Sequence, residues 1–191
     1  MAQAPLGHKL GPDEFLAWER EQKERHIYVH GEVFAMAGGS PRHNHLAAQV
    51  IGRLSTSLKD GCRTFTSDQK IGLPENEFVY ADAVVVCGPP ALRPGTSDVI
   101  TNPAVVVAVL SKGTESYDRG DEQRGYLALT SLRHYVLVSQ RESRVEIYTR
   151  QDDGSFRFEV LGSGASLNLD KIGATIALDD LYGDALTLPG D

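Results

Sequence analysis

The sequence lacks several features that would assign it to a class at once. It has two cysteines, Cys62 and Cys87, in 191 residues, and their spacing fits no C-x-x-C metal site. Each is predicted to be a small buried thiol, and without a disulfide framework a reducing compartment is the default. Residues 1–11 lack the apolar centre of a signal peptide, and no apolar run has the length of a membrane span. These absences predict a cytoplasmic protein with no membrane partner.

The chain also lacks an excess of positive charge. Its formal net charge of −7 gives no general attraction to nucleic acid or anionic membranes, so a polyanion site would need a local basic patch. The 41% hydrophobic and 24% charged content is that of an ordinary globular protein, and the length fits one domain. With no repeat or linker, we expect a disordered tail over 1–11, a single domain over 12–183 and a C-terminal tail over 184–191.

Two apolar runs within residues 79–111 organise the chain. Residues 83–87 and 104–110 are short, rich in valine and bounded by proline and glycine, which favours strands over helices. Their continuous hydrophobicity predicts strands that are covered on both faces, in the middle of a sheet flanked by helices. Asp82 stands at the start of the first run. A lone carboxylate there needs a cation, a donor or water nearby, which makes Asp82 the first candidate for a functional residue.

Helical and strand patterns alternate along the rest of the chain. An apolar stripe with a Ser40 N-cap and Pro41 predicts a helix to about Lys59. Further helices are expected over 12–19, 117–130 and 178–182. Strands are expected over 27–29 and 33–36, around a turn near His30-Gly31, and over 62–73, 134–138, 144–148 and 156–161. The fold class is therefore α/β, or α+β, with an N-terminal helix and hairpin.

Several blocks, in order, resemble the Uma-two family of restriction endonucleases. They are Tyr28-Val29-x-Gly31-Glu32-Val33, Ser40-Pro41-Arg42-His43-Asn44, Thr66-Ser67-Asp68-Gln69-Lys70, Tyr80-x-Asp82 with its valine run, Thr101-Asn102-Pro103, Tyr117-Asp118-Arg119-Gly120 and Leu132-Arg133-x-Tyr135-Val136. The resemblance covers roughly residues 12–183. It implies the PD-(D/E)XK nuclease fold, a mixed sheet flanked by helices, which holds magnesium or manganese between carboxylates and uses a lysine to position water.

The positions that carry this chemistry are partly changed. By resemblance, Asp82 is the family aspartate, although Ala81 replaces the proline before it. The family glutamate corresponds to Ala108, and the helix lysine corresponds to Glu122. Alanine cannot coordinate a cation, and Glu122 reverses the charge of the lysine. The scaffold blocks remain while the site changes, which predicts impaired or lost catalysis.

The remaining candidates follow from these changes. We take Asp82, Lys70 and Glu122 as catalytic candidates, with Asp82 and Glu32 as metal ligands. Each has a structural alternative. Asp82 would be a hydrogen-bonded aspartate at a strand end, and Lys70 a surface lysine. Glu122 would belong to a charged helix face, and Glu32 would be an exposed acid of the hairpin. Candidate nucleic-acid contacts are Arg42 and His43 at a helix N-terminus, together with Arg119. Capping and surface polarity are the competing explanation for the first two.

Two functions therefore remain open. One is a magnesium- or manganese-dependent DNA endonuclease. The other is a non-catalytic nuclease relative that binds DNA or pairs with a protein partner. By analogy with the family, a homodimer is also expected.

Overall fold

A computed structural model describes residues 7, 9–36 and 38–191. Most of the tail predicted to be disordered therefore lies outside the described residues. The α-helices are α1 Pro12–Glu19, α2 Pro41–Ser57, α3 Glu115–Asp118, α4 Asp121–Ala128 and α5 Leu178–Tyr182. The 3₁₀ helices are η1 Pro74–Asn76, η2 Asp170–Ile172 and η3 Ala185–Thr187. The strands are β1 His26–Val29, β2 Glu32–Ala35, β3 Cys62–Thr66, β4 Lys70–Gly72, β5 Phe78–Tyr80, β6 Ala83–Cys87, β7 Val99–Ile100, β8 Val105–Val109, β9 His134–Val138, β10 Arg144–Arg150, β11 Phe156–Gly162, β12 Ser166–Leu169 and β13 Ala174–Ala177.

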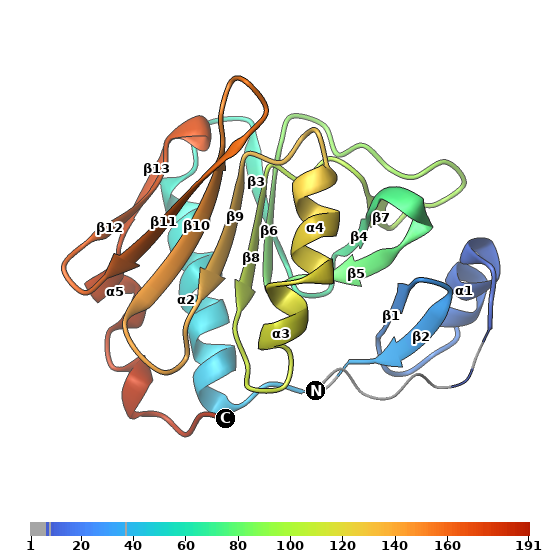
Figure 1. Ribbon diagram of the computed structural model, residues 1–191, viewed down its shortest axis with the longest axis horizontal. Helices are drawn as coiled ribbons and strands as arrows, with labels where there is room; N and C mark the ends of the chain where they lie inside the picture. Colours follow the sequence, from blue (N-terminus) through green and yellow to red (C-terminus); the bar gives the residue numbers. More distant parts are fainter. Residues whose placement is uncertain (1–6, 8, 37) are drawn as a thin grey trace.

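A six-stranded mixed sheet forms the centre of the molecule, in the order β11-β10-β9-β8-β6-β3 (Figure 1). β8 runs parallel to β9, and the other neighbours in this sheet are antiparallel. The two valine-rich runs are the neighbouring strands β6 and β8, and most of their residues are buried. The prediction of an α+β fold, with a mixed sheet flanked by helices, is confirmed.

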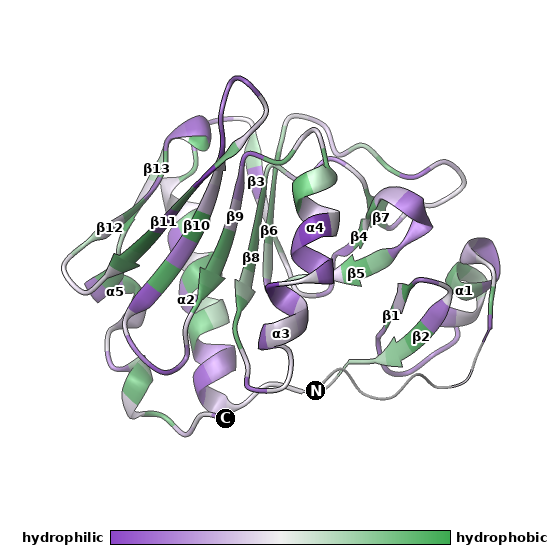
Figure 2. Cartoon of the chain, viewed as in Figure 1, coloured by the Kyte–Doolittle hydropathy of each residue, from purple (hydrophilic) through white to green (hydrophobic). Residues whose placement is uncertain are grey.

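Alternate residues of the central strands supply two separate cores, because successive side chains of a strand point to opposite faces. On one face Val85 and Val107 pack with Leu46 and Leu54 of α2 and with the β12–β13 hairpin. On the other face Val84 and other residues pack with α4 and the smaller sheet. The hydrophobic colouring of β6, β8 and β9 in Figure 2 follows from this double covering. None of the helices in the described part of the chain is long and apolar enough to cross a membrane.

A smaller sheet, ordered β2-β1-β5-β4-β7, carries the N-terminal part of the chain. Its β1–β2 hairpin turns at His30 and Gly31, which both have positive φ, as the predicted turn requires. α1 packs Phe15 against Tyr28 and Phe78 in a third core. The hairpin is therefore fixed beside the central sheet through β5, and it can contribute side chains to a cleft between the two sheets.

Two predicted elements are each divided in the structure. The expected strand over residues 62–73 is two strands, because a turn in which Gln69 N–H donates to Thr66 O moves the chain from the larger sheet to the smaller one. The expected helix over residues 117–130 is two helices that meet at Gly120. A Cβ at Gly120 would lie 2.9 Å from Ser116 O, so this close turn requires glycine. Both divisions result from packing that a local pattern does not contain.

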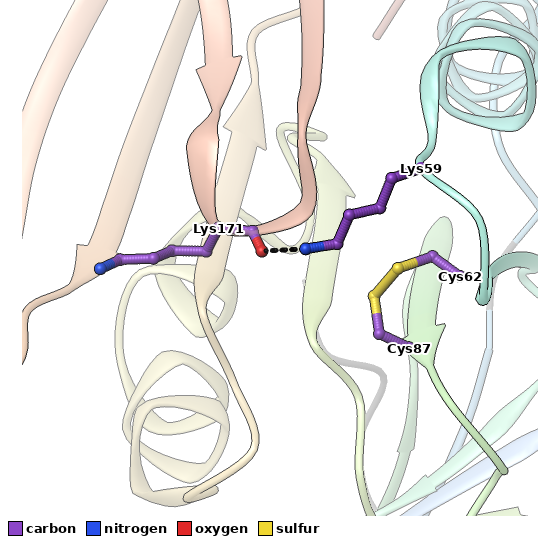
Figure 3. The surroundings of a disulfide bond; sticks show 4 residues. All are labelled: Lys59, Cys62, Cys87 and Lys171. Carbon is purple, nitrogen blue, oxygen red and sulfur yellow. Dashed lines mark hydrogen bonds between the residues drawn. A yellow bond between two sulfur atoms is a disulfide. The ribbon is translucent and has the colours of Figure 1, made fainter.

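The prediction of two free thiols is wrong. β3 pairs antiparallel with β6 so that Cys62 and Cys87 lie directly opposite each other, with Cα atoms 3.9 Å apart, and their sulfurs form a disulfide (Figure 3). The expected reducing compartment rested on the absence of a disulfide and loses that basis. Nearby, Lys59 Nζ donates to Lys171 O and links the end of α2 to η2.

The C-terminal segment packs against α2. Arg42 donates to the carbonyl oxygens of Leu188 and Gln140, and Ala185 is fully buried. Residues 184–191 therefore lie on the domain surface near the N-terminus of α2.

We expect reduction of the disulfide to lower the free energy of unfolding by up to about 3 kcal/mol, because the bond closes a loop between residues 25 apart in sequence. Urea denaturation with and without dithiothreitol measures this effect. The Cys62→Ser/Cys87→Ser variant is the control, and its stability should not respond to the reductant. Detection of two thiols per chain in the denatured, unreduced protein would contradict the bond.

Candidate active-site cleft

Asp82 lies where the chain passes from the smaller sheet to the larger one. It follows β5 and directly precedes β6. Its Oδ2 accepts a hydrogen bond from Val109 N–H at 2.7 Å, and its Oδ1 is 3.5 Å from His43 Nε2. Burial raises the pKa of Asp82, while the charge of His43 and the Val109 N–H act in the opposite direction. The aspartate is thus oriented by the end of β8 and by the first turn of α2.

Ala108 lies beside Asp82 because of the β6–β8 register. Ala83 pairs with Val107, so the next position along β8 lies next to Asp82. Ala108 is buried and lines the same cleft. Its methyl group offers no ligand atom, so at this position the cleft has an apolar surface.

A pair of carboxyl groups forms the opposite wall of the cleft. Asp118, at the end of α3, and Glu122, in the first turn of α4, are both buried, and their side chains are hydrogen-bonded to each other. Thr114 Oγ1 donates to Asp118 at 2.7 Å, and Tyr126 Oη donates to Glu122 at 3.2 Å. One of the two carboxyls must therefore carry the shared proton.

The electrostatics of the pair favour this shared proton. Burial raises the pKa of Asp118 to about 6, despite its hydrogen bonds from Thr114 and Glu122. Burial, and then the negative charge of Asp118, raise the pKa of Glu122 well above its ordinary value. Two adjacent carboxylates in a poorly solvated site cannot both ionise without a large cost. Glu122 is accordingly the member of the pair whose pKa is raised by the charge of its neighbour as well as by burial, which favours it as the proton donor to Asp118.

These groups surround a cavity of about 200 Å³. The N-terminal hairpin contributes Ile27 and Phe34, and the side chains of Tyr80 and Tyr117 also line it. Within the described lining, the ionisable groups besides the tyrosines are His43 and four acidic residues, one of them Asp191 of the C-terminal segment; no lysine or arginine is among them. The cleft is therefore acidic and largely apolar, with a single imidazole next to Asp82.

Two predicted site residues lie elsewhere. Lys70 is 4% exposed, and its Nζ is 3.2 Å from Asp98 Oδ2, away from the cleft lining. Glu32 is exposed at the start of β2, and its backbone forms a bridge with Lys9. The structure brings neither side chain to Asp82. The assignments of Lys70 as a catalytic residue and Glu32 as a metal ligand remain predictions without geometric support.

The predicted nucleic-acid contacts divide in the same way. His43 lines the cleft, whereas the guanidinium of Arg42 donates to Leu188 O of the C-terminal segment and to Gln140 O. Arg119 forms ion pairs with Glu146 and Glu115 on the outer side of α3. His43 alone of the three faces Asp82.

Sequence reasoning missed Asp118 as a site residue. The spacing of four between Asp118 and Glu122 was visible, and such a spacing brings side chains together on a helix. The chain instead breaks at Gly120, so the hydrogen-bonded acid pair depends on the α3–α4 turn as much as on the spacing.

A comparison with known protein families identifies the family of this chain. Residues 12–179 match the profile of the Uma2 family, described as "Putative restriction endonuclease". The chain belongs to the Uma2 family. Two relatives of this Uma2 protein come from the cyanobacterium Synechocystis. The uncharacterized protein slr1290 is 35% identical over 176 residues, covering 91% of this chain and 92% of its own. The uncharacterized protein sll1609 is 27% identical over 157 residues, covering 81% and 89%.

A solved structure supports the fold. A crystal structure from Anabaena variabilis, described as that of "a putative nuclease belonging to DUF820", superposes on this chain with a TM-score of 0.74. The match covers 93% of this Uma2 chain and 99% of that chain, at 15% identity. At this identity the likeness concerns the fold alone.

The cleft of this Uma2 protein does not fit a magnesium ion well. Magnesium needs oxygen ligands in octahedral geometry, usually with one or two ionised carboxylates. Here Ala108 supplies none, and Glu122 holds a proton toward Asp118. In the described chain no group of three histidine, cysteine, aspartate or glutamate side chains is placed to hold a metal. On the side of the cleft formed by β6 and β8, Asp82 is therefore the acid available to a metal, because Asp118 and Glu122 are paired with each other.

The acid pair predicts a specific pH dependence of stability. A carboxyl with a raised pKa binds its proton more tightly in the folded state, so its stabilisation is complete at low pH and is lost as pH rises through the raised pKa. For Asp118, stability is lost between about pH 3.8 and pH 6. The pKa of Glu122 is also raised, so the loss continues to higher pH. We expect Glu122→Gln to gain stability relative to wild type, on the order of 1–3 kcal/mol, between pH 4 and pH 8.

Urea unfolding of both proteins across that range measures the difference. Glu21→Gln, which removes an exposed carboxyl, is the control and should follow wild type. Parallel profiles for Glu122→Gln and wild type would show that the pair does not share a proton.

Proposed function

We propose that this Uma2 protein keeps the nuclease scaffold but has lost efficient metal-dependent DNA cleavage, and that it acts as a non-catalytic module that binds DNA or a protein partner. One observation carries the proposal. Glu122 is buried in a hydrogen bond with Asp118 next to Ala108, and by the family resemblance it stands in place of the lysine.

The chemistry supports this proposal in two steps. Phosphodiester cleavage in such a site needs a cation that acts as a Lewis acid and a group that positions the attacking water. Of the acids outside the pair, Asp82 lies beside β8, where burial raises its pKa, and Asp191 lines the cleft from the C-terminal segment. The acid pair adds no cationic donor for a phosphate, and a phosphate close to ionised carboxyls is repelled. His43 remains as the one imidazole near Asp82, and at 3.5 Å the two side chains are too far apart for a normal hydrogen bond.

A second candidate function is an active DNA endonuclease with rearranged ligands. The observation in its favour is that Asp82, Asp118 and Glu122 line one cavity. Magnesium or manganese would then displace the shared proton and be held by these acids. Its cost is the loss of the hydrogen bond within the pair, and for that reason we place it second.

Manganese binding separates the two candidates without a known substrate. We expect isothermal calorimetry to show no binding by wild type at millimolar manganese. The Ala108→Glu/Glu122→Lys variant should bind, because it restores the family ligand and releases the acid pair. Adding Asp82→Ala to that variant should abolish binding, and circular dichroism should show that all the variants are folded.

Binding by wild type that disappears in Asp82→Ala, together with manganese-dependent nicking of plasmid DNA, would contradict the proposal. It would establish the rearranged endonuclease instead.

If wild type binds DNA through contacts with its phosphates, the affinity should depend on salt concentration. We expect the affinity for a labelled duplex, measured by fluorescence anisotropy, to fall between about 50 and 200 mM NaCl with a log–log slope steeper than about −1. Retention that ignores ionic strength would exclude phosphate contacts as its basis. Absence of binding even at low salt would leave a protein partner as the ligand.

A further inference from the structure

The strand β11 is an exposed edge of the larger sheet (Figure 1). Among the described strands it pairs with β10 alone. Phe158 and Val160 are each 49% exposed, and Arg157 and Glu159 on the other face are exposed as well. Proteins usually protect such an edge with proline, bulges or inward-pointing charges, because its free backbone groups can pair with another chain. Its seven residues contain no proline and pair with β10 in continuous register, and the charged side chains on the strand are Arg157 and Glu159.

The backbone groups that face outward can be identified from the ladder on the inner side. Arg150 N–H donates to Arg133 O, and Ser139 N–H donates to Arg144 O, so the even-numbered residues of β10 bond to β9. The odd-numbered residues of β10 therefore bond to β11, where their register partners are Arg157, Glu159 and Leu161. The N–H and C=O groups of Phe156, Phe158 and Val160 consequently point away from the sheet.

This edge is complementary to itself. We propose that β11 pairs antiparallel with β11 of a second copy of this chain, centred on Phe158, and joins the two sheets into one. In this register Phe158 faces Phe158 of the second copy, and Phe156 faces Val160 of the second copy. These are the residues whose backbone groups point outward, so each facing pair forms two hydrogen bonds.

The charges select this register over its neighbours. With Phe158 at the centre, Arg157 lies opposite Glu159 of the second copy, and the symmetry repeats the pair. A register centred on Arg157 would place two arginines opposite each other, and one centred on Glu159 would place two glutamates opposite each other. Like charges directly opposite in a ladder are destabilising, whereas opposite charges stabilise. In the free chain, Arg157 and Glu159 instead form an exposed ion pair at 3.0 Å, which is worth little.

The apolar face of the strand supports the same partner. Phe158 packs against Tyr148 of β10 with ring centroids 4.7 Å apart, and the strand continues this face with Val160. Pairing would cover Phe158 and Val160 in both copies, and it would remove the exposed edge.

Charge exchange tests the pairing. Sedimentation velocity of wild type should show a concentration-dependent dimer. Arg157→Glu and Glu159→Arg should each raise the dissociation constant at least about tenfold, because each places like charges opposite twice. A mixture of the two single variants should recover the dimer. One variant then carries two glutamates on β11 and the other carries two arginines, so opposite charges face each other. The double variant Arg157→Glu/Glu159→Arg should also dimerise as wild type does.

A backbone variant provides an independent check. Val160→Pro removes an outward N–H, which an edge strand tolerates, so the monomer should stay folded while the dimer is lost. Val160→Thr keeps the N–H and the branched side chain and should dimerise. A wild type that is monomeric at all concentrations would overturn the proposal and leave the edge to a different protein. A dimer that is indifferent to all β11 variants would overturn it too, because its interface would lie elsewhere.

Discussion

The antiparallel pairing of β6 with β8 is the constraint on which the cleft depends. It places Ala108 beside Asp82 and directs Val109 N–H onto the Asp82 carboxylate. The same pairing buries both valine runs, which contribute to the cores on the two faces of the sheet. A shift of one residue would exchange the faces of an entire strand, so the hydrophobic cores fix the geometry of the cleft. Orientation of the aspartate is in this sense a consequence of core packing.

The acid pair satisfies its own buried polar groups. A lysine opposite Asp82 would be stabilised there by the negative charge. Glu122 instead satisfies its buried carboxyl through Asp118 and Tyr126. The buried site is therefore paired internally and does not require a cation for its stability.

The cleft and the β11 edge lie on different parts of the same sheet. The cleft is formed where β6 and β8 meet the smaller sheet, and β11 is at the end of the strand order, beyond β9 and β10. A dimer joined through β11 would leave the cleft of each copy open. Two such clefts on one continuous sheet would give a bound partner two equivalent sites, which increases its effective affinity.

The sequence by itself determined the elements whose signal is local. The valine runs predicted buried central strands, the His30-Gly31 turn predicted the hairpin, and ordered motifs across residues 12–183 predicted the family and its fold. The candidate site could be predicted in part: Asp82, His43 and Glu122 do line the cleft, and so does Ala108, which the resemblance assigned to the site. Tertiary structure alone decided the rest. Cys62 meets Cys87 only through the register of β3 with β6. Lys70 pairs with Asp98 because β4 belongs to the smaller sheet, and β3 to the larger one. Asp118 joins Glu122 across the Gly120 turn. These contacts join residues whose proximity depends on how separate elements pack, and no local pattern carries that information.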